Sequence, residues 1–152
     1  LLVNGGASAH VHRTVRPTTH ATRSRAAWGF RFAGGGGPKR ADPDRQAVAV
    51  TGDGGFAQYM GELCTAVHYG MDITHVLLNN QQLGKIPKEQ GTVGMPIWKT
   101  ALTNPDFARY AQNCGALGIR VAKAAELDEA LTRALRYEGP ALVEVLTDPE
   151  LV

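Results

Sequence analysis

Two apolar segments of this chain each end in a short polar motif, and the spacing of the motifs constrains the fold more than any other feature. Residues 47–51 are followed by Gly52-Asp53-Gly54-Gly55, and residues 73–78 by Asn79-Asn80. The 27 positions from Asp53 to Asn80 are what a turn, a helix of about four turns and a returning strand consume in a right-handed crossover. A carboxylate and a carboxamide are therefore predicted at one edge of a parallel sheet, where open α/β folds bind ligands.

The residue types in the two motifs suit a divalent cation that carries a diphosphate. Hard cations such as Mg²⁺ prefer oxygen ligands and keep few protein ligands when a phosphate supplies the rest. Asp53 supplies a charge and Asn80 a neutral oxygen, while Gly54 and Gly55 lack a Cβ and let a diphosphate approach the backbone at a helix start. The alternative is a pair of turns without a ligand. Two motifs at this spacing, each after an uncharged run, favour the metal and diphosphate.

This pattern of motifs resembles the thiamin diphosphate signature of the pyruvate oxidase and acetolactate synthase family, in its C-terminal, diphosphate-binding domain. Residues 83–86 and 88–90 also resemble the loop after the second motif in pyruvate oxidases. The resemblance covers residues 42–152. It implies that Mg²⁺ is bound by the side chains of Asp53 and Asn80 and by the backbone carbonyl of Gln82. The cofactor contacts that it implies are Gly52, Asp53, Gly54, Gly55, Asn80, Gln82 and Gly84.

The resemblance implies a portion of an enzyme that uses thiamin diphosphate and Mg²⁺ on a 2-oxo acid, with pyruvate as the favoured substrate. Decarboxylation followed by acetyl transfer or oxidation is the expected reaction, and the cofactor's thiazolium carbon attacks the keto carbon. Glu89 lies where the family brings an acidic side chain near the reactive end of the cofactor, which would make it catalytic. The alternative for Glu89 is an ordinary solvated charge.

The same resemblance implies partners that this chain does not contain. The family's activating glutamate lies in a pyrimidine-binding domain of the same or a neighbouring subunit, and any FAD site lies in another absent domain. Full-length members are expected to be homo-oligomers. The chain alone is therefore expected to catalyse nothing, and a non-catalytic, truncated remnant that folds without turnover is the alternative function.

The remaining pattern alternates strand and helix. An apolar stripe predicts a single helix that stops at Gly70, and its members are Phe56, Met60, Leu63 and Val67. Residues 81–103 lack periodicity and are typical of an active-site loop. Asn104 is expected to cap a helix that ends at Gly115. A strand at 119–121, a helix over 127–135 and a strand at 141–146 follow, with Glu144 near an exposed edge. The predicted fold is α/β: a doubly wound, mostly parallel sheet in three layers, with helices on both faces and an irregular N-terminal segment.

The charge distribution divides the chain into two parts. Residues 1–40 hold seven Lys or Arg and no acidic residue, whereas residues 47–152 hold eight basic and twelve acidic residues. We therefore separate a basic, Gly- and Arg-rich segment at 1–41 from a cofactor-binding domain at 42–152. The segment is either a genuine arm for nucleic acid or an acidic partner, or a disordered, degraded or misread stretch. Its lack of periodicity and of interleaved aromatics favours the second reading, so no nucleic-acid partner is expected.

Cysteine usage and hydropathy indicate the compartment. Cys64 and Cys114 are far apart in sequence on apolar faces of predicted helices, which favours reduced core residues over a disulfide. No run of 18 apolar residues exists, and the first residues lack the pattern of a secretory signal. A cytoplasmic protein without a membrane span is therefore expected.

Overall fold

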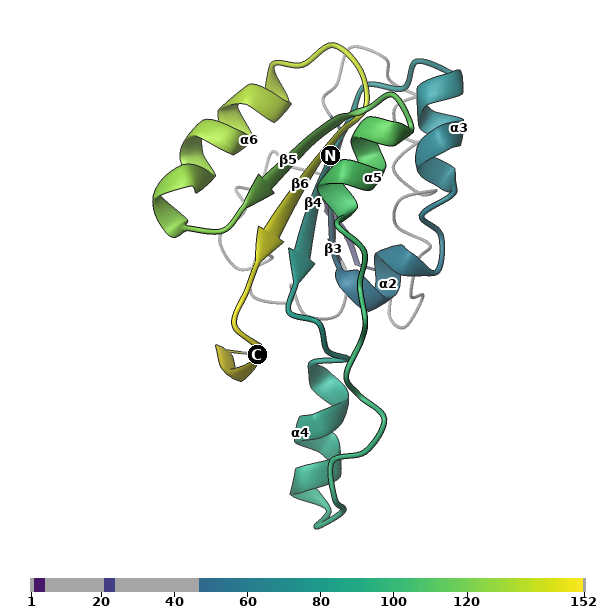
Figure 1. Ribbon diagram of the computed structural model, residues 1–152. Coiled ribbons are helices and arrows are strands. Elements are labelled where there is room, and N and C mark those ends of the chain that lie inside the picture. The colour runs from purple at the N-terminus through teal and green to yellow at the C-terminus, as the bar shows by residue number, and fades with distance from the viewer. Residues whose placement is uncertain (1, 5–20, 24–46, 152) are drawn as a thin grey trace.

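The computed structural model describes residues 2–4, 21–23 and 47–151 of the chain. The described residues form a six-stranded parallel sheet in the order β2-β1-β3-β4-β6-β5 (Figure 1). The strands are β1 (Leu2–Asn4), β2 (Ala21–Arg23), β3 (Ala47–Gly52), β4 (Ile73–Asn79), β5 (Leu117–Val121) and β6 (Ala141–Leu146). Because β3, β4 and β6 are interior strands, their side chains are covered on both faces, as parallel sheets require.

The helices lie in the connections between these strands, and all but α4 pack on a face of the sheet. They are α2 (Asp53–Ala57), α3 (Glu62–His68), α4 (Lys85–Thr92), α5 (Phe107–Asn113) and α6 (Leu127–Leu135), with short 3₁₀ turns η3 (Ala124–Glu126) and η4 (Pro149–Leu151). None of the helices in the described part of the chain has the length and hydrophobicity that a membrane crossing needs.

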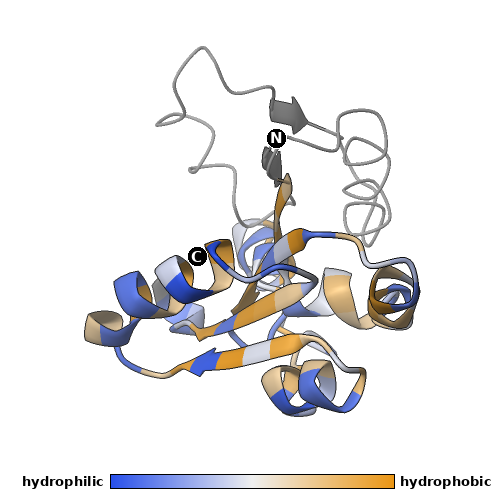
Figure 2. Ribbon diagram, turned by 90° about the horizontal axis from the view of Figure 1, so that it is seen from above, coloured by the Kyte–Doolittle hydropathy of each residue, from blue (hydrophilic) through white to orange (hydrophobic). Residues whose placement is uncertain are grey.

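Two separate apolar clusters show that the sheet is covered on both faces. One cluster contains buried residues of α2, α3 and α5, and the other contains buried residues of α6. Alternation along β6 divides the strand between them, since Leu142 packs in the first cluster and Ala141 and Val143 in the second. Figure 2 shows the apolar strands with helices on both sides. The predicted three-layer, doubly wound α/β fold is confirmed.

The predicted apolar stripe is confirmed, but the single helix expected over it is wrong. Phe56 and Leu63 are buried and Met60 and Val67 pack against them, yet the helix is divided into α2 and α3. Between the two helices the backbone forms i to i+3 hydrogen bonds, among them Glu62 N to Tyr59 O at 2.9 Å. Such tighter turns replace α-helical bonds where propensity is low, and glycines stand at positions 54, 55 and 61.

Residues 81–103 leave the sheet at the end of β4 and return to the start of α5 as a projection that carries α4 (Figure 1). At its neck, Leu83 N donates to Thr100 O at 2.9 Å and Leu102 N donates to Gln81 O at 2.8 Å. Further out, the Gln90 side chain bonds both the backbone N–H and the carbonyl of Trp98, at 3.2 Å each. The lack of periodicity did not indicate the eight-residue helix α4, and the expected role of residues 81–103 as an active-site loop stays a prediction.

The N-terminal segment contributes two short strands. Both β1 and β2 extend the sheet beyond β3, in parallel register with it. The rest of residues 1–41 lies outside the described residues. The separation of this segment from the domain at 42–152, and its interpretation as disordered or degraded, stay predictions.

A buried histidine lies between the sheet and α2. His75 Nε2 is 2.7 Å from Thr51 Oγ1, and the imidazole packs edge-on against the ring of Phe56 at 4.9 Å between centroids. Complete burial lowers the pKa of His75 from 6.5 to about 3, because the charged imidazolium would lose its hydration. His75 is therefore neutral in the folded protein across the physiological range.

This burial predicts a pH-dependent stability. A depressed pKa means that the unfolded chain binds a proton that the folded chain refuses, so the contribution of His75 is fully present above pH 6.5 and is lost as pH falls toward 3. Denaturant unfolding at pH 7 and pH 5 should show a loss of about 2 kcal/mol from this group. His75→Gln should remove that part of the pH dependence, whereas His68→Gln, at an exposed position on α3, should leave it intact. An equal pH dependence in His75→Gln and the unchanged protein would contradict the assignment.

Candidate functional site

The two motifs lie side by side at the carboxyl edge of the sheet. Strands β3 and β4 are parallel neighbours, with Gly52 opposite Leu78 in the register. The residues that follow them therefore leave the sheet at the same edge, and the predicted adjacency of Asp53 with Asn79 and Asn80 at this edge is confirmed.

Asp53 is a buried carboxylate, with 2% of its surface exposed. Its Oδ1 accepts a hydrogen bond from Gly54 N at 2.9 Å. Its Oδ2 accepts from Gln81 N at 2.8 Å and from Asn104 Nδ2 at 2.7 Å. Within the described ranges, no Lys, Arg or His forms an ion pair with Asp53. Among the described residues, its partners are therefore neutral N–H groups, which is an unusual environment for a buried carboxylate.

The backbone at Gln81 is bent so that its N–H reaches Asp53. Gln81 has a φ of +56°, in the left-handed region that side chains other than glycine seldom adopt. Holding a residue there costs on the order of 1 kcal/mol, so the surrounding contacts must compensate. The hydrogen bond to Asp53 and the neck of the 81–103 projection are the contacts on either side of this residue.

Two asparagines that sequence reasoning assigned no site role belong to the network around this carboxylate: Asn104 donates to Asp53, and Asn79 shares its donors. Asn79 Oδ1 accepts from the same two donors as Asp53, namely Gln81 N at 3.2 Å and Asn104 Nδ2 at 2.9 Å. Asn104 was expected to cap α5, and this is wrong: the cap is Asp106, whose carboxylate accepts from Arg109 N at 2.8 Å. The Asn104 side chain is thereby left to join Asp53 to Asn79.

A second buried carboxylate, Glu144, orients Asn79. Glu144 Oε1 accepts from Asn79 Nδ2 at 2.7 Å and its Oε2 from Ala108 N at 3.1 Å, in the first turn of α5. Arg120 Nη1 lies 3.8 Å from Oε2. Because an ionised carboxylate only accepts, it fixes the amide of Asn79 with its oxygen toward Asn104. The expectation of an exposed edge for Glu144 is wrong, since β6 lies between β4 and β5 and Glu144 is fully buried.

The other residues predicted to bind metal lie in the turn that follows Asn79. Asn80 Oδ1 accepts from Gln82 N at 3.1 Å, and the Gln82 carbonyl accepts from Gly84 N at 2.8 Å. Asp53 and Asn80 thus accept from the consecutive amides of residues 81 and 82. The described residues contain no cluster of three His, Cys, Asp or Glu side chains suited to a metal, so any cation here relies on one carboxylate and neutral oxygens. The ligand roles of Asn80 and Gln82 stay predictions.

The glycines of the first motif differ in their surroundings. A Cβ added to Gly52 would meet nothing within 4 Å, so the space in front of it is open. A Cβ on Gly54 would lie 2.8 Å from Leu83 Cδ2 and 3.2 Å from Leu102 Cδ1. The absence of a Cβ at Gly54 therefore lets Leu83 and Leu102, at the base of the projection, pack against α2. The sequence did not reveal this packing role. The cofactor role of Gly55 stays a prediction.

Glu89 lies on the projection. Its carboxylate pairs with Lys85 Nζ at 3.4 Å, and more than half of each side chain is exposed. Such exposed i to i+4 pairs contribute a few tenths of a kcal/mol. Among the described contacts, none joins Glu89 to Asp53, and the proposed catalytic role of Glu89 stays a prediction.

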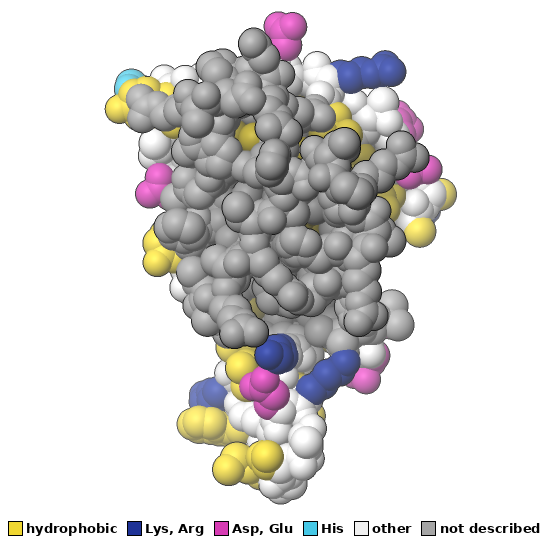
Figure 3. Space-filling model, turned by 180° about the vertical axis from the view of Figure 1, so that it is seen from behind, with side chains coloured by type: hydrophobic (Ala, Val, Ile, Leu, Met, Phe, Trp, Pro, Cys, Tyr) yellow, Lys and Arg dark blue, Asp and Glu magenta, His cyan; other side chains and the backbone are white. Residues whose placement is uncertain are grey.

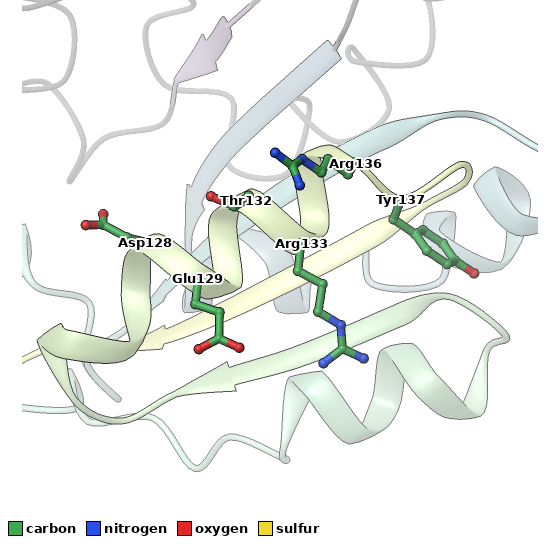
Figure 4. A pocket seen from close by; sticks show the side chains of 6 residues that line it. All are labelled: Asp128, Glu129, Thr132, Arg133, Arg136 and Tyr137. Carbon is green, nitrogen blue, oxygen red and sulfur yellow. The ribbon is translucent and has the colours of Figure 1, made fainter.

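A depression of about 590 Å³ lies elsewhere on the surface, along α6. Figure 4 shows that side chains of α6 and of the two residues after it line the depression: Asp128, Glu129, Thr132, Arg133, Arg136 and Tyr137. The acidic residues stand in the first turn and Arg133 in the last, an arrangement that complements the helix dipole. None of the predicted site residues lines this depression, which is a solvated helix face.

Comparison with known proteins relates this geometry to a family. Residues 4–145 match the family model described as thiamine pyrophosphate enzyme, C-terminal TPP binding domain. The match begins inside the segment that sequence analysis separated from the domain.

Several proteins with assigned names are similar in sequence to this chain. The chain is 48% identical over 109 residues to the Bacillus subtilis protein named "Putative thiamine pyrophosphate-containing protein YdaP", which is 72% of this chain and 19% of that protein. It is 36% identical over 113 residues to the acetolactate synthase large subunit of Haemophilus influenzae, covering 73% of this chain and 20% of the relative.

A solved structure with the same fold is the thiamine diphosphate-dependent 4-hydroxybenzoylformate decarboxylase of Rhodococcus jostii RHA1. The TM-score is 0.73 at 29% identity, over 79% of this chain and 23% of that one. The chain therefore spans about a fifth of the length of the relatives that it matches.

The hydrogen bonds of Glu144 predict that its carboxylate contributes more to the free energy of unfolding than an exposed acidic side chain does. Glu144→Gln keeps the shape but turns one acceptor into a donor that faces Ala108 N–H, and it removes the charge beside Arg120. Denaturant unfolding should show a loss of about 1–3 kcal/mol. The matched change Glu129→Gln, on the exposed face of α6, should alter stability by less than about 0.5 kcal/mol. Equal stabilities for the two variants would contradict the role assigned to Glu144.

Proposed function

Because the chain belongs to the thiamine pyrophosphate enzymes, through their C-terminal TPP-binding domain, we propose that the edge around Asp53 binds the diphosphate of thiamin diphosphate through Mg²⁺. The observation that carries this proposal is the buried Asp53 carboxylate, which has N–H donors but no cationic side chain among its described partners. A buried charge is costly unless it is paired or coordinates a metal.

The acceptor capacity of Asp53 leaves room for a cation. An ionised carboxylate has about four lone-pair sites, and the described N–H donors use three of them. Because donors fill the side of Oδ2 that faces Gln81 and Asn104, the remaining position is on Oδ1, next to Gly54. A metal ligand there would add to the network without breaking any of its bonds.

The nearby oxygens are of the type that Mg²⁺ prefers. The proposed set combines the Asp53 carboxylate, the Asn80 side-chain oxygen and the Gln82 backbone carbonyl, all hard oxygen donors. Asn80 and Gln82 each accept one hydrogen bond and keep a second lone pair. A set with one negative charge suits a cation that also carries a diphosphate, since the phosphate oxygens supply the remaining charge and ligands.

Around this set, the chain's own groups would orient the cofactor. The open space in front of Gly52 admits a bulky anion close to the backbone, and α2 begins there without a side-chain cap. The carboxylate of Glu144 acts indirectly, because it orients Asn79 and through it the Asn104 amide that holds Asp53. Thiamin diphosphate, when bound, supplies the carbanion chemistry that decarboxylation of a 2-oxo acid needs.

A 2-oxo acid is the substrate class that we propose. Among the relatives, the decarboxylase is named for 4-hydroxybenzoylformate, which is itself a 2-oxo acid, and others are named acetolactate synthases. Pyruvate-type decarboxylation with acetyl transfer or oxidation is the proposed reaction, with Glu89 of the projection near the reacting end of the cofactor.

Turnover is proposed to require a pyrimidine-binding domain from the same or a neighbouring subunit in a homo-oligomer. The exposed apolar side chains at the tip of the 81–103 projection support a docking role, and Figure 3 shows hydrophobic side chains gathered there. They are Val93, Met95, Ile97 and Trp98, each more than 60% exposed. A cluster of this kind is typical of a surface that another protein segment covers. The chain by itself is proposed to bind the cofactor and not to turn over substrate.

Titration calorimetry with thiamin diphosphate tests the proposal. Binding should require Mg²⁺ and vanish with a chelator. Asp53→Asn keeps the shape of the side chain but removes its charge, so the affinity should fall at least about 100-fold, as loss of a charged ligand at a close ion pair costs several kcal/mol.

The matched control is Asp128→Asn on α6, which should bind as the unchanged chain does. Circular dichroism of Asp53→Asn separates loss of the site from loss of the fold. Metal-independent binding, or equal affinity in a folded Asp53→Asn variant, would overturn the proposal.

A further inference from the structure

The two cysteines of this chain, which are its only ones, lie in contact although 50 positions separate them. Cys64 is on α3 and Cys114 follows α5, and their Sγ atoms are 3.4 Å apart. Sequence reasoning expected core residues far from each other. Cys64 is instead exposed and Cys114 half-buried, and both are free thiols. The pair therefore lies at the surface seam between α3 and α5.

Contacts on both sides of the pair hold this seam together. Tyr110 Oη on α5 donates to Met60 O, just before α3, at 3.0 Å. At the other end, a Cβ on Gly115 would lie 3.5 Å from Val67 Cγ1 of α3. Both helices also contribute to the same apolar cluster. The approach of the two sulfurs is therefore set by the packing of the two helices and not by a mobile loop.

We propose that Cys64 and Cys114 form an oxidisable dithiol site, which a hydroperoxide converts into an intramolecular disulfide that ties α3 to α5. This inference is independent of the cofactor proposal, because neither cysteine contacts Asp53 or its described partners.

The chemistry proceeds in two steps. The Cys64 sulfur, as thiolate, attacks one oxygen of hydrogen peroxide, the O–O bond breaks, and a sulfenic acid and one water form. The Cys114 sulfur then attacks the Cys64 sulfur, the S–O bond breaks, and a second water leaves. The pair loses two electrons and two protons, and the peroxide is reduced to two waters. Burial raises the pKa of the Cys114 thiol, so the exposed Cys64 is assigned the first attack.

The geometry requires little movement for the second step. The sulfurs must approach from 3.4 Å to the disulfide length of about 2.05 Å, which small rotations of the two side chains supply. The bond would close a loop of 50 residues, and closing a long loop restricts the unfolded chain strongly. Oxidation should therefore stabilise the fold.

The seam connects the two segments that hold Asp53. Helix α3 follows α2, which begins at Asp53, and α5 follows the segment that contains Asn104. A disulfide between α3 and α5 would fix these segments relative to each other.

The test treats the purified 152-residue chain with one equivalent of hydrogen peroxide. Thiol titration should show both thiols lost together, non-reducing electrophoresis should show a monomer, and peptide mapping should find the 64–114 cross-link. Thermal unfolding should shift upward on the order of 10 °C and return after treatment with dithiothreitol.

The variants Cys64→Ser and Cys114→Ser should show no upward shift after the same treatment. Should either variant fail to fold, the unchanged chain with both thiols alkylated before oxidation serves as the second control. Sulfinic acid at Cys64 with Cys114 still reduced, or covalent dimers in place of the monomer, or a cross-link without a change in thermal unfolding, would overturn the proposal.

Discussion

The structure depends on how one buried negative charge is held. The Asp53 carboxylate receives N–H groups from three separate segments: the start of α2, the turn after β4 and the stretch before α5. The bonds from Gln81 and Asn104 join parts of the chain that are distant in sequence. The left-handed backbone at Gln81 and the position of Asn104 each bring an N–H group to this carboxylate, so the geometry of this edge depends on its hydrogen bonds.

A comparison of the two buried carboxylates shows why one is a ligand candidate and the other is not. Glu144 lies beside Arg120, under the first turn of α5, and its oxygens are directed at Asn79 and Ala108. Asp53 is connected to it through the amides of Asn79 and Asn104 but has no cation of its own in the described part of the chain. Glu144 thus has a cationic side chain within 4 Å, which it shares with Asp106, whereas Asp53 pairs with no cationic side chain of the described residues. The amides between them keep the two negative charges apart.

Features set by local pattern could be predicted from the sequence. The adjacency of the two motifs followed from the length of one crossover, and the burial of Phe56 and Leu63 followed from helical periodicity. Asn104 could not be found in this way, because its approach to Asp53 depends on the path by which residues 81–103 leave and return.

Glu144 shows the same limit for the sheet. Its burial depends on β6 pairing between β4 and β5, an order that is not the order along the chain. In the sequence, Glu144 is a single charged residue in an otherwise apolar strand. Such a residue is found either in an edge strand or at a buried position where hydrogen bonds hold its carboxylate. The contact of Cys64 with Cys114 likewise follows from the packing of α3 on α5, which no local pattern encodes.

Crystallography of this chain with Mn²⁺ in place of Mg²⁺, in the presence of thiamin diphosphate, tests the central claim most directly, since the anomalous signal of the ion marks its position. The account predicts one peak within about 2.3 Å of an Asp53 carboxylate oxygen, of the Asn80 side-chain oxygen and of the Gln82 carbonyl. A metal bound away from Asp53, or a diphosphate bound at this edge with no metal, would contradict it.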